Sequence, residues 1–188
     1  MERQLAEETR RVQEYALTRF SGPARRISSM ELPEAVEETA AILGEDEPPR
    51  QLVFPAFQWE EYIARPDFMR YSARQDGWKI YLIRPSTGVR GSYMDEAAMD
   101  RLIVKRAGLP VVAVKVIYLN KAYIREGEID GDSLLRESDV TRRSEKRQRT
   151  VLRLLQSARE ILTGEEEVPP EYRCDMPGPC SVCQREMA

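Results

Sequence analysis

The stretch RPDFMRYSARQDGWKIYLIR, residues 65–84, decides the fold because it predicts two strands joined by a turn. The first strand is expected to end at Pro66-Asp67, the turn to lie at residues 75–77, and the second strand to run from Trp78 to Arg84. Asp76-Gly77 between two apolar-rich runs is a hairpin signal, because glycine accepts the positive φ that such a turn requires. The hairpin therefore determines which residues of the two strands face each other.

This register places Asp67 across the hairpin from Leu82 and Arg84, which share a strand face because side chains repeat every second residue. An acid facing an acid-x-lysine on the next strand is how magnesium-dependent nucleases hold a metal ion and a water. Here Leu82 has no ligand atom, and Arg84 keeps the positive charge but is effectively never deprotonated. Asp67 and Arg84 are the candidate catalytic residues, with Asp67 a candidate Mg or Mn ligand. The alternative is that Asp67 is an ordinary turn residue.

Composition limits the class of protein. The 188 residues, 41% hydrophobic and 32% charged, suit one soluble globular domain with a sizeable core. The net charge of −3 means that any basic surface must be local, and the lack of histidine excludes His-based acid/base chemistry. No apolar run is long enough for a membrane span, and the start Met1-Glu2-Arg3-Gln4 is not a signal peptide. We therefore expect a cytoplasmic protein with no membrane partner.

The spacing of apolar residues along the rest of the chain predicts an α/β fold, with a mixed central sheet flanked by helices. We expect strands at 51–57, 59–64 and 111–119, a short turn or helix at 130–135, and helices at 3–20, 28–41, 94–107 and 140–162. Val111–Leu119 is almost continuously apolar, which makes it the candidate for the centre of the sheet. The expected divisions are an N-terminal helical segment (1–50), a core (51–164) and a cysteine-containing tail (165–188).

Basic residues at the start of the last helix and in a loop before the third are the candidate nucleic-acid contacts: Arg142, Arg143, Lys146, Arg147 and Arg90. Lysine and arginine on one helix can follow phosphates and give a salt-sensitive affinity for DNA. The alternative is a solvated helix face, since Glu145 interrupts the run. The aromatic residues of the strands are expected to be mostly core, with a base-stacking platform as the alternative.

The three cysteines lie together in the tail as Cys174-x₅-Cys180-x₂-Cys183, and an odd, clustered set argues against a disulfide framework. Three thiolates at these spacings make most of a site for zinc or an iron–sulfur cluster. The fourth ligand would be a carboxylate, a water or the side chain of a protein partner. The alternative is a reduced tail that binds no metal.

Several motifs between Leu52 and Cys183 carry a resemblance to a known family. They are ARPD (64–67), WKIYLIRPST (78–87), YMDEAAM (93–99), AGL (107–109) and YLNKAYIREGEID (118–130). On these motifs the chain resembles the RecB-like branch of the PD-(D/E)XK nuclease superfamily, specifically an uncharacterised bacterial family with a C-terminal cysteine cluster. The resemblance implies a restriction-endonuclease-like core, Mg- or Mn-dependent DNA cleavage as the ancestral activity, and a fourth cysteine that this chain lacks.

The chain also departs from the family pattern. Family members have Glu-Val-Lys where this chain has Leu82-Ile83-Arg84, and usually a glutamine at the position of Met99. The resemblance therefore implies at most a metal-ligand role for Asp67 and a phosphate contact for Arg84. A migrated acid, Asp95 or Glu96, is an alternative replacement for Leu82.

Three functions follow from these features. The first is a non-catalytic nuclease-like protein that binds nucleic acid or a partner in DNA repair, recombination or mobile-element processes. The second is an active metal-dependent nuclease. The third is a structural or regulatory docking subunit.

Overall fold

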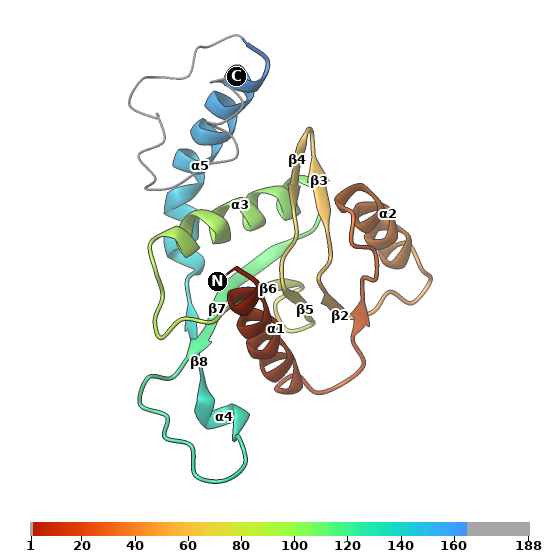
Figure 1. The fold of residues 1–188 in the computed structure, drawn as a ribbon. Coiled ribbons are helices and arrows are strands. Elements are labelled where there is room, and N and C mark those ends of the chain that lie inside the picture. The colour runs from red at the N-terminus through yellow and green to blue at the C-terminus, as the bar shows by residue number, and fades with distance from the viewer. Residues whose placement is uncertain (1, 165–188) are drawn as a thin grey trace. The chain divides into compact units, whose positions relative to one another are not determined.

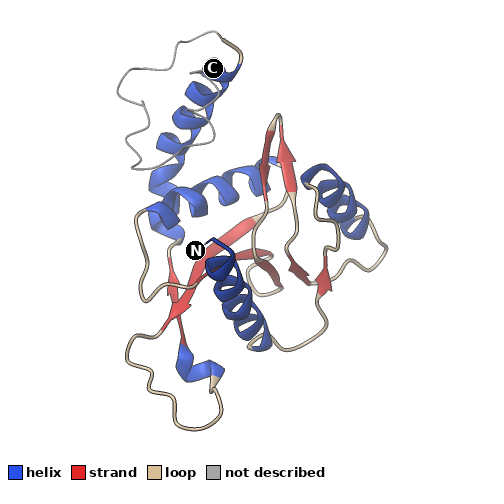
Figure 2. Ribbon diagram, in the orientation of Figure 1, coloured by secondary structure: helices blue, strands red, loops and turns tan. Residues whose placement is uncertain are grey.

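A computed structural model describes residues 2–164 of the chain (Figures 1 and 2). Contacts divide the chain into two compact units, Met1–Val151 and Leu152–Ala188, and the fold below is that of the first. The elements, in order, are α1 (Glu2–Thr18), β1 (Arg25–Arg26), α2 (Leu32–Leu43), β2 (Gln51–Val53), β3 (Phe57–Trp59), β4 (Tyr62–Ala64), β5 (Phe68–Ser72), β6 (Gly77–Arg84), α3 (Ser92–Arg106), β7 (Val111–Leu119), α4 (Gly131–Leu134), β8 (Leu135–Asp139) and α5 (Thr141–Leu162).

The main sheet is mixed and has the strand order β1-β2-β5-β6-β7-β8. β1 and β2 are parallel, as are β6 and β7, and the other neighbouring strands are antiparallel. Helix α3 makes the crossover between β6 and β7, as a parallel pair requires. The predicted fold class, α/β with a mixed sheet flanked by helices, is confirmed.

The alternation of side chains along the strands divides the core between the two faces of the sheet. Phe68, Tyr81 and Ile83 point to one face, where they pack with Ala16 and Phe20 from α1 and the loop that follows it. The alternate residues of β5, β6 and β7 point to the other face, where they pack against α2 and α3. Among them are Met69, Ile80, Leu82, Val114 and Val116. A helix thus covers part of each face (Figure 1).

The central hairpin has the predicted register but different strand and turn details. Phe68 pairs with Tyr81, which places Asp67 opposite Leu82 as predicted. The first strand does not end at Asp67, however, but begins directly after it, because Phe68–Ser72 is the segment that pairs with β6. The positive φ of the turn belongs to Asp76 (48°) and not to Gly77.

The segment 51–64 also differs from the prediction of two strands in the main sheet. Phe54 has a positive φ of 54° and precedes Pro55, which lacks an N–H, so β2 ends at Val53. The residues beyond form a separate two-stranded sheet, β3–β4.

Two edge strands, β1 and β8, were not predicted because they are two and five residues long and carry mainly charged or polar residues. Strand β7 has the predicted bounds, but it lies next to the edge strand β8, and the middle pair of the sheet is β5 and β6.

The predicted helices are confirmed, with shifted ends. α2 starts at Leu32 instead of residue 28, and Pro33 lies in its first turn as expected. α3 ends at Arg106, and Gly108 follows with a φ of 96°. In the part of the chain that the structure describes, no helix has the length and apolarity needed to cross a membrane.

Gly77 is required for a different reason than turn geometry. A Cβ at this position would lie 2.5 Å from Cγ1 of Val112 and 2.9 Å from the carbonyl oxygen of Pro110. The latter is a backbone atom already fixed by a 2.7 Å hydrogen bond from the Trp78 N–H. Gly77 therefore permits the close approach of β6 to the start of β7.

We predict that Gly77→Ala destabilises the fold by roughly 1–3 kcal/mol, the usual cost of overpacking. Gly91→Ala is the matched control, since its Cβ would meet nothing within 4 Å and its φ is negative. Urea unfolding of both variants measures the difference. Equal stability of the two variants would contradict the steric role of Gly77.

Candidate functional site

Asp67 lies at the start of β5 with its carboxylate almost fully buried, and three groups donate hydrogen bonds to it. Oδ2 accepts from the backbone N–H of Ile83 at 2.7 Å and from Nη1 of Arg84 at 2.6 Å. Oδ1 accepts from Nε2 of Gln13, on α1, at 2.8 Å. The carboxylate thus continues the hydrogen-bond ladder between β5 and β6 by one step. It also connects this ladder to α1, whose Gln13 precedes Asp67 by 54 residues.

Arg84 ends β6 and bridges two carboxylates. Besides Asp67, its guanidinium contacts Glu96 on α3 through both Nη2 and Nε, the latter at 3.2 Å from Oε2. The ring of Tyr93 lies 5.9 Å from its central carbon. Burial by itself would lower the pKa of Arg84, but the neighbouring charges of Asp67 and Glu96 raise it. Arg84 is therefore a permanent cation held between two acids.

Burial also raises the pKa of Asp67, and the Arg84 guanidinium and the Ile83 N–H oppose that rise. The charge state of Asp67 therefore depends on its contact with Arg84.

Asp100 stands one helical turn after Glu96 on α3 and is only 5% exposed. Burial, followed by the negative charges of Glu96 and Asp67, raises its pKa well above the ordinary value. Asp100 therefore adds a buried acid whose charged form its surroundings disfavour. We call Asp67, Arg84, Glu96 and Asp100 the Arg84 centre.

The structure distinguishes the two candidate migrated acids. Glu96 joins the Arg84 centre, whereas Asp95 points to α5 and pairs with Arg147, whose Nε lies 2.6 Å from Oδ1. Leu82 is fully buried in the apolar core beneath α3, and Met99 packs against the same core.

Sequence reasoning missed Gln13 and Asp100. The spacing of Asp100 from Glu96, four residues along a predicted helix, was the available signal for Asp100. Nothing in the sequence pattern points from Gln13 to Asp67, 54 residues later.

The donor set of the Arg84 centre does not fit a divalent cation. Within residues 2–164, no group of three or more His, Cys, Asp and Glu side chains is arranged to hold a metal ion. The space between Asp67 and Glu96 is occupied by a guanidinium, whose charge repels a second cation. The three cysteines lie outside the described residues, so the zinc or iron–sulfur site stays a prediction.

The candidate nucleic-acid residues divide into two groups. Arg147 is engaged by Asp95, and Glu145, which interrupts the basic run, pairs with the buried Arg101 on α3 at 2.6 Å. Arg142, Arg143, Lys146 and Arg90 are exposed, and they form no ion pair within the described part of the chain.

No protein-family model matches the chain, and it matches no curated protein and no solved structure. Membership of the RecB-like nuclease branch therefore stays a prediction that rests on the sequence motifs.

We predict that Arg84→Met lowers the free energy of unfolding by about 3–5 kcal/mol, because it leaves the buried Asp67 without its counter-charge. Adding Asp67→Asn should recover part of this loss, with a coupling above about 1 kcal/mol. Arg147→Met is the matched control, since its bridge to Asp95 is exposed and worth under about 1 kcal/mol. Urea unfolding provides the values, and additive effects of the two substitutions in the double variant would contradict the coupling.

A second prediction concerns pH. Above pH 3.8, the ordinary pKa of its carboxyl, Asp100 is ionised in the unfolded chain but still protonated in the folded one. Stability should therefore fall by about 1.4 kcal/mol per pH unit from there up to the folded pKa. Asp100→Asn removes this dependence, so its stability relative to the natural chain should rise between pH 4 and pH 7. A difference that is constant across this range in urea titrations would contradict the buried, protonated state.

Proposed function

We propose that this protein is a non-catalytic nuclease-like protein that binds nucleic acid, in processes such as DNA repair, recombination or mobile-element biology. The observation that carries the proposal is the Arg84 guanidinium between Asp67 and Glu96. In a metal-dependent nuclease, carboxylates in this position hold a divalent ion that activates the attacking water. Here the Arg84 guanidinium neutralises the charges of the two carboxylates, and a guanidinium can neither replace the divalent ion nor activate a water.

The exposed basic residues on α5 support the nucleic-acid part of the proposal. Arg142 and Lys146 are four residues apart and so lie on the same side of the helix. Because these residues and Arg143 have no carboxylate partner among residues 2–164, their charges are available to phosphates. The resemblance to nucleases favours nucleic acid over other anions.

The active-nuclease alternative has one specific observation in its favour. Asp67 and Glu96 contact the same guanidinium, so the two carboxylates converge on one point. Displacement of Arg84 would leave two acids facing each other, and Glu96 is then the migrated acid that this alternative needs.

We predict that the protein neither binds Mn²⁺ at millimolar concentration nor cleaves linear duplex or single-stranded DNA with Mg²⁺ or Mn²⁺. Leu82→Glu with Arg84→Lys recreates the acid-x-lysine pattern and should gain Mn²⁺ binding, because it adds a ligand and removes the guanidinium. Arg84→Lys by itself is the matched control, as it adds no carboxylate. Calorimetric titration measures Mn²⁺ binding, and circular dichroism shows whether each variant is folded.

DNA cleavage by the natural chain that Asp67→Asn abolishes would overturn the non-catalytic proposal and favour the active nuclease. A lack of DNA binding even at low salt would favour the docking-subunit function.

A further inference from the structure

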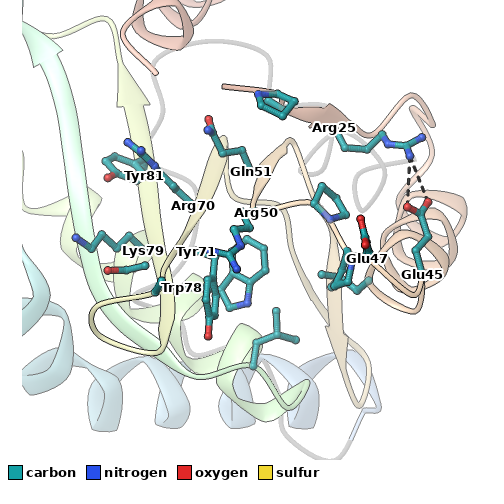
Figure 3. Close-up of a pocket in the computed structure, with 18 of the residues that line it drawn as sticks. Arg25, Glu45, Glu47, Arg50, Gln51, Arg70, Tyr71, Trp78, Lys79 and Tyr81 are labelled. Carbon is teal, nitrogen blue, oxygen red and sulfur yellow. Dashed lines mark hydrogen bonds and ion pairs between the residues drawn. The ribbon is translucent and has the colours of Figure 1, made fainter. Parts of the chain in front are cut away.

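A wide groove lies at the other end of β6 from the Arg84 centre (Figure 3). Its walls come from the loop before α2, the segment 43–51, the β5–β6 hairpin and Leu109. Lys79, in this groove, is five residues from Arg84, or roughly 16 Å along the strand. The groove has a volume of about 1600 Å³, more than the roughly 300–1000 Å³ of a small-molecule pocket. Its size favours an extended ligand.

The groove is positively charged in a chain of net negative charge. Arg25 is neutralised by Glu45 at 3.3 Å, which leaves Arg50, Arg70, Arg74 and Lys79. In the described part of the chain none of these four forms an ion pair. The carboxylates nearby are Glu47, on the wall, Asp76, which accepts a hydrogen bond from the Tyr71 hydroxyl, and Asp139 at the end of β8, which interacts electrostatically with Lys79.

Two of these cations are placed where they repel each other. Arg70 on β5 and Lys79 on β6 are paired directly across the hairpin, so both side chains leave the same face of the sheet. Like charges in directly opposite positions of an antiparallel pair destabilise the sheet. An anion bound between them would remove this cost.

Aromatic rings line the groove on the other face of the hairpin, because Tyr71 and Trp78 alternate with Arg70 and Lys79 along β5 and β6. The guanidinium of Arg50 sits over the ring of Tyr71, 5.7 Å from its centroid, and Trp78 packs edge-on against Tyr71 at 5.6 Å. Figure 3 shows these three side chains together, between the Arg70–Lys79 pair and the Glu47 wall. A guanidinium held against an aromatic ring offers its outer face to a nucleic-acid base for stacking.

We propose that this groove binds single-stranded nucleic acid. An extended strand that passes from one face of the hairpin to the other contacts Arg70, Arg74 and Lys79 through its phosphates and stacks a base on the Arg50–Tyr71 pair. A single strand fits better than a duplex, whose bases are stacked on each other and cannot reach Arg50. The choice of nucleic acid as ligand rests on the proposed function, but the groove shares no residue with the Arg84 centre or with the basic residues of α5.

The test uses the full chain and a fluorescein-labelled twelve-residue oligodeoxythymidine, followed by fluorescence anisotropy. Arg70→Gln with Lys79→Gln should raise Kd about tenfold and reduce the slope of log Kd against log salt by about 1.4, or about 0.7 for each lost phosphate contact. The same variant should be at least as stable as the natural chain, because it relieves the repulsion. Lys105→Gln with Lys121→Gln is the matched control: it makes the same charge change at two exposed lysines that lie neither in the groove nor on α5, and it should change Kd less than twofold.

Tryptophan fluorescence locates the bound strand independently. The chain has two tryptophans: Trp78 lines the groove, and Trp59 lies on β3 beneath Arg106. In Trp59→Phe, unlabelled oligodeoxythymidine should quench the remaining emission, and in Trp78→Phe it should not.

Each failure has a distinct meaning. Unchanged binding in the groove variant, together with a loss of binding in Arg142→Gln with Arg143→Gln, would overturn the groove proposal and leave the proposed function standing. Equal affinity for a twelve-base-pair duplex, or for an acidic peptide of equal charge, would overturn the assignment to single strands. The absence of binding to any DNA would overturn both proposals.

Discussion

The ion pair between Arg84 and Asp67 is the constraint on which the centre of the structure depends. Through it and its neighbours, the end of β6 is tied to the start of β5, to Glu96 on α3 and to Gln13 on α1. These elements cover both faces of the sheet, so one polar cluster fixes how the two layers of helix lie on it. Hydrophobic packing is non-directional and tolerates sliding, whereas a carboxylate with three donors does not.

Such a cluster is an expensive way to build a core. Removing charges from water costs several kcal/mol for each ion, and apolar residues of similar volume often serve stability as well or better. The buried Asp100 adds to this cost, because burial and the negative charges of Glu96 and Asp67 raise its pKa. Stability alone does not explain this concentration of acids around one arginine, and the proposed nuclease-like origin accounts for it.

The sequence predicted the parts of this centre that follow from local periodicity. Once the hairpin is recognised, strand alternation places Asp67 opposite Leu82 and beside Arg84, and the helix after it brings in Glu96. Gln13 could not be predicted, because its contact joins segments that only tertiary packing brings together. Strands β1 and β8 were missed because edge strands need no apolar alternation. The groove was missed for another reason: Arg70 and Lys79 read as ordinary solvated residues until the register shows that they face each other.

The positive side chains at the two ends of β6 differ in whether acids of the same chain neutralise them. At one end, the positive charge of Arg84 is neutralised by acids of the same chain, so it adds nothing to the attraction of an external anion. At the other end, the charges of Arg70 and Lys79 face each other and form no ion pair in the described part of the chain, so a bound anion would relieve their repulsion. A strand whose positive charge is neutralised internally at one end and left unpaired at the other fits the proposed role of binding a polyanion without cutting it. On the proposed function, binding and cleavage depend on different residues of one strand, so the first does not require the second.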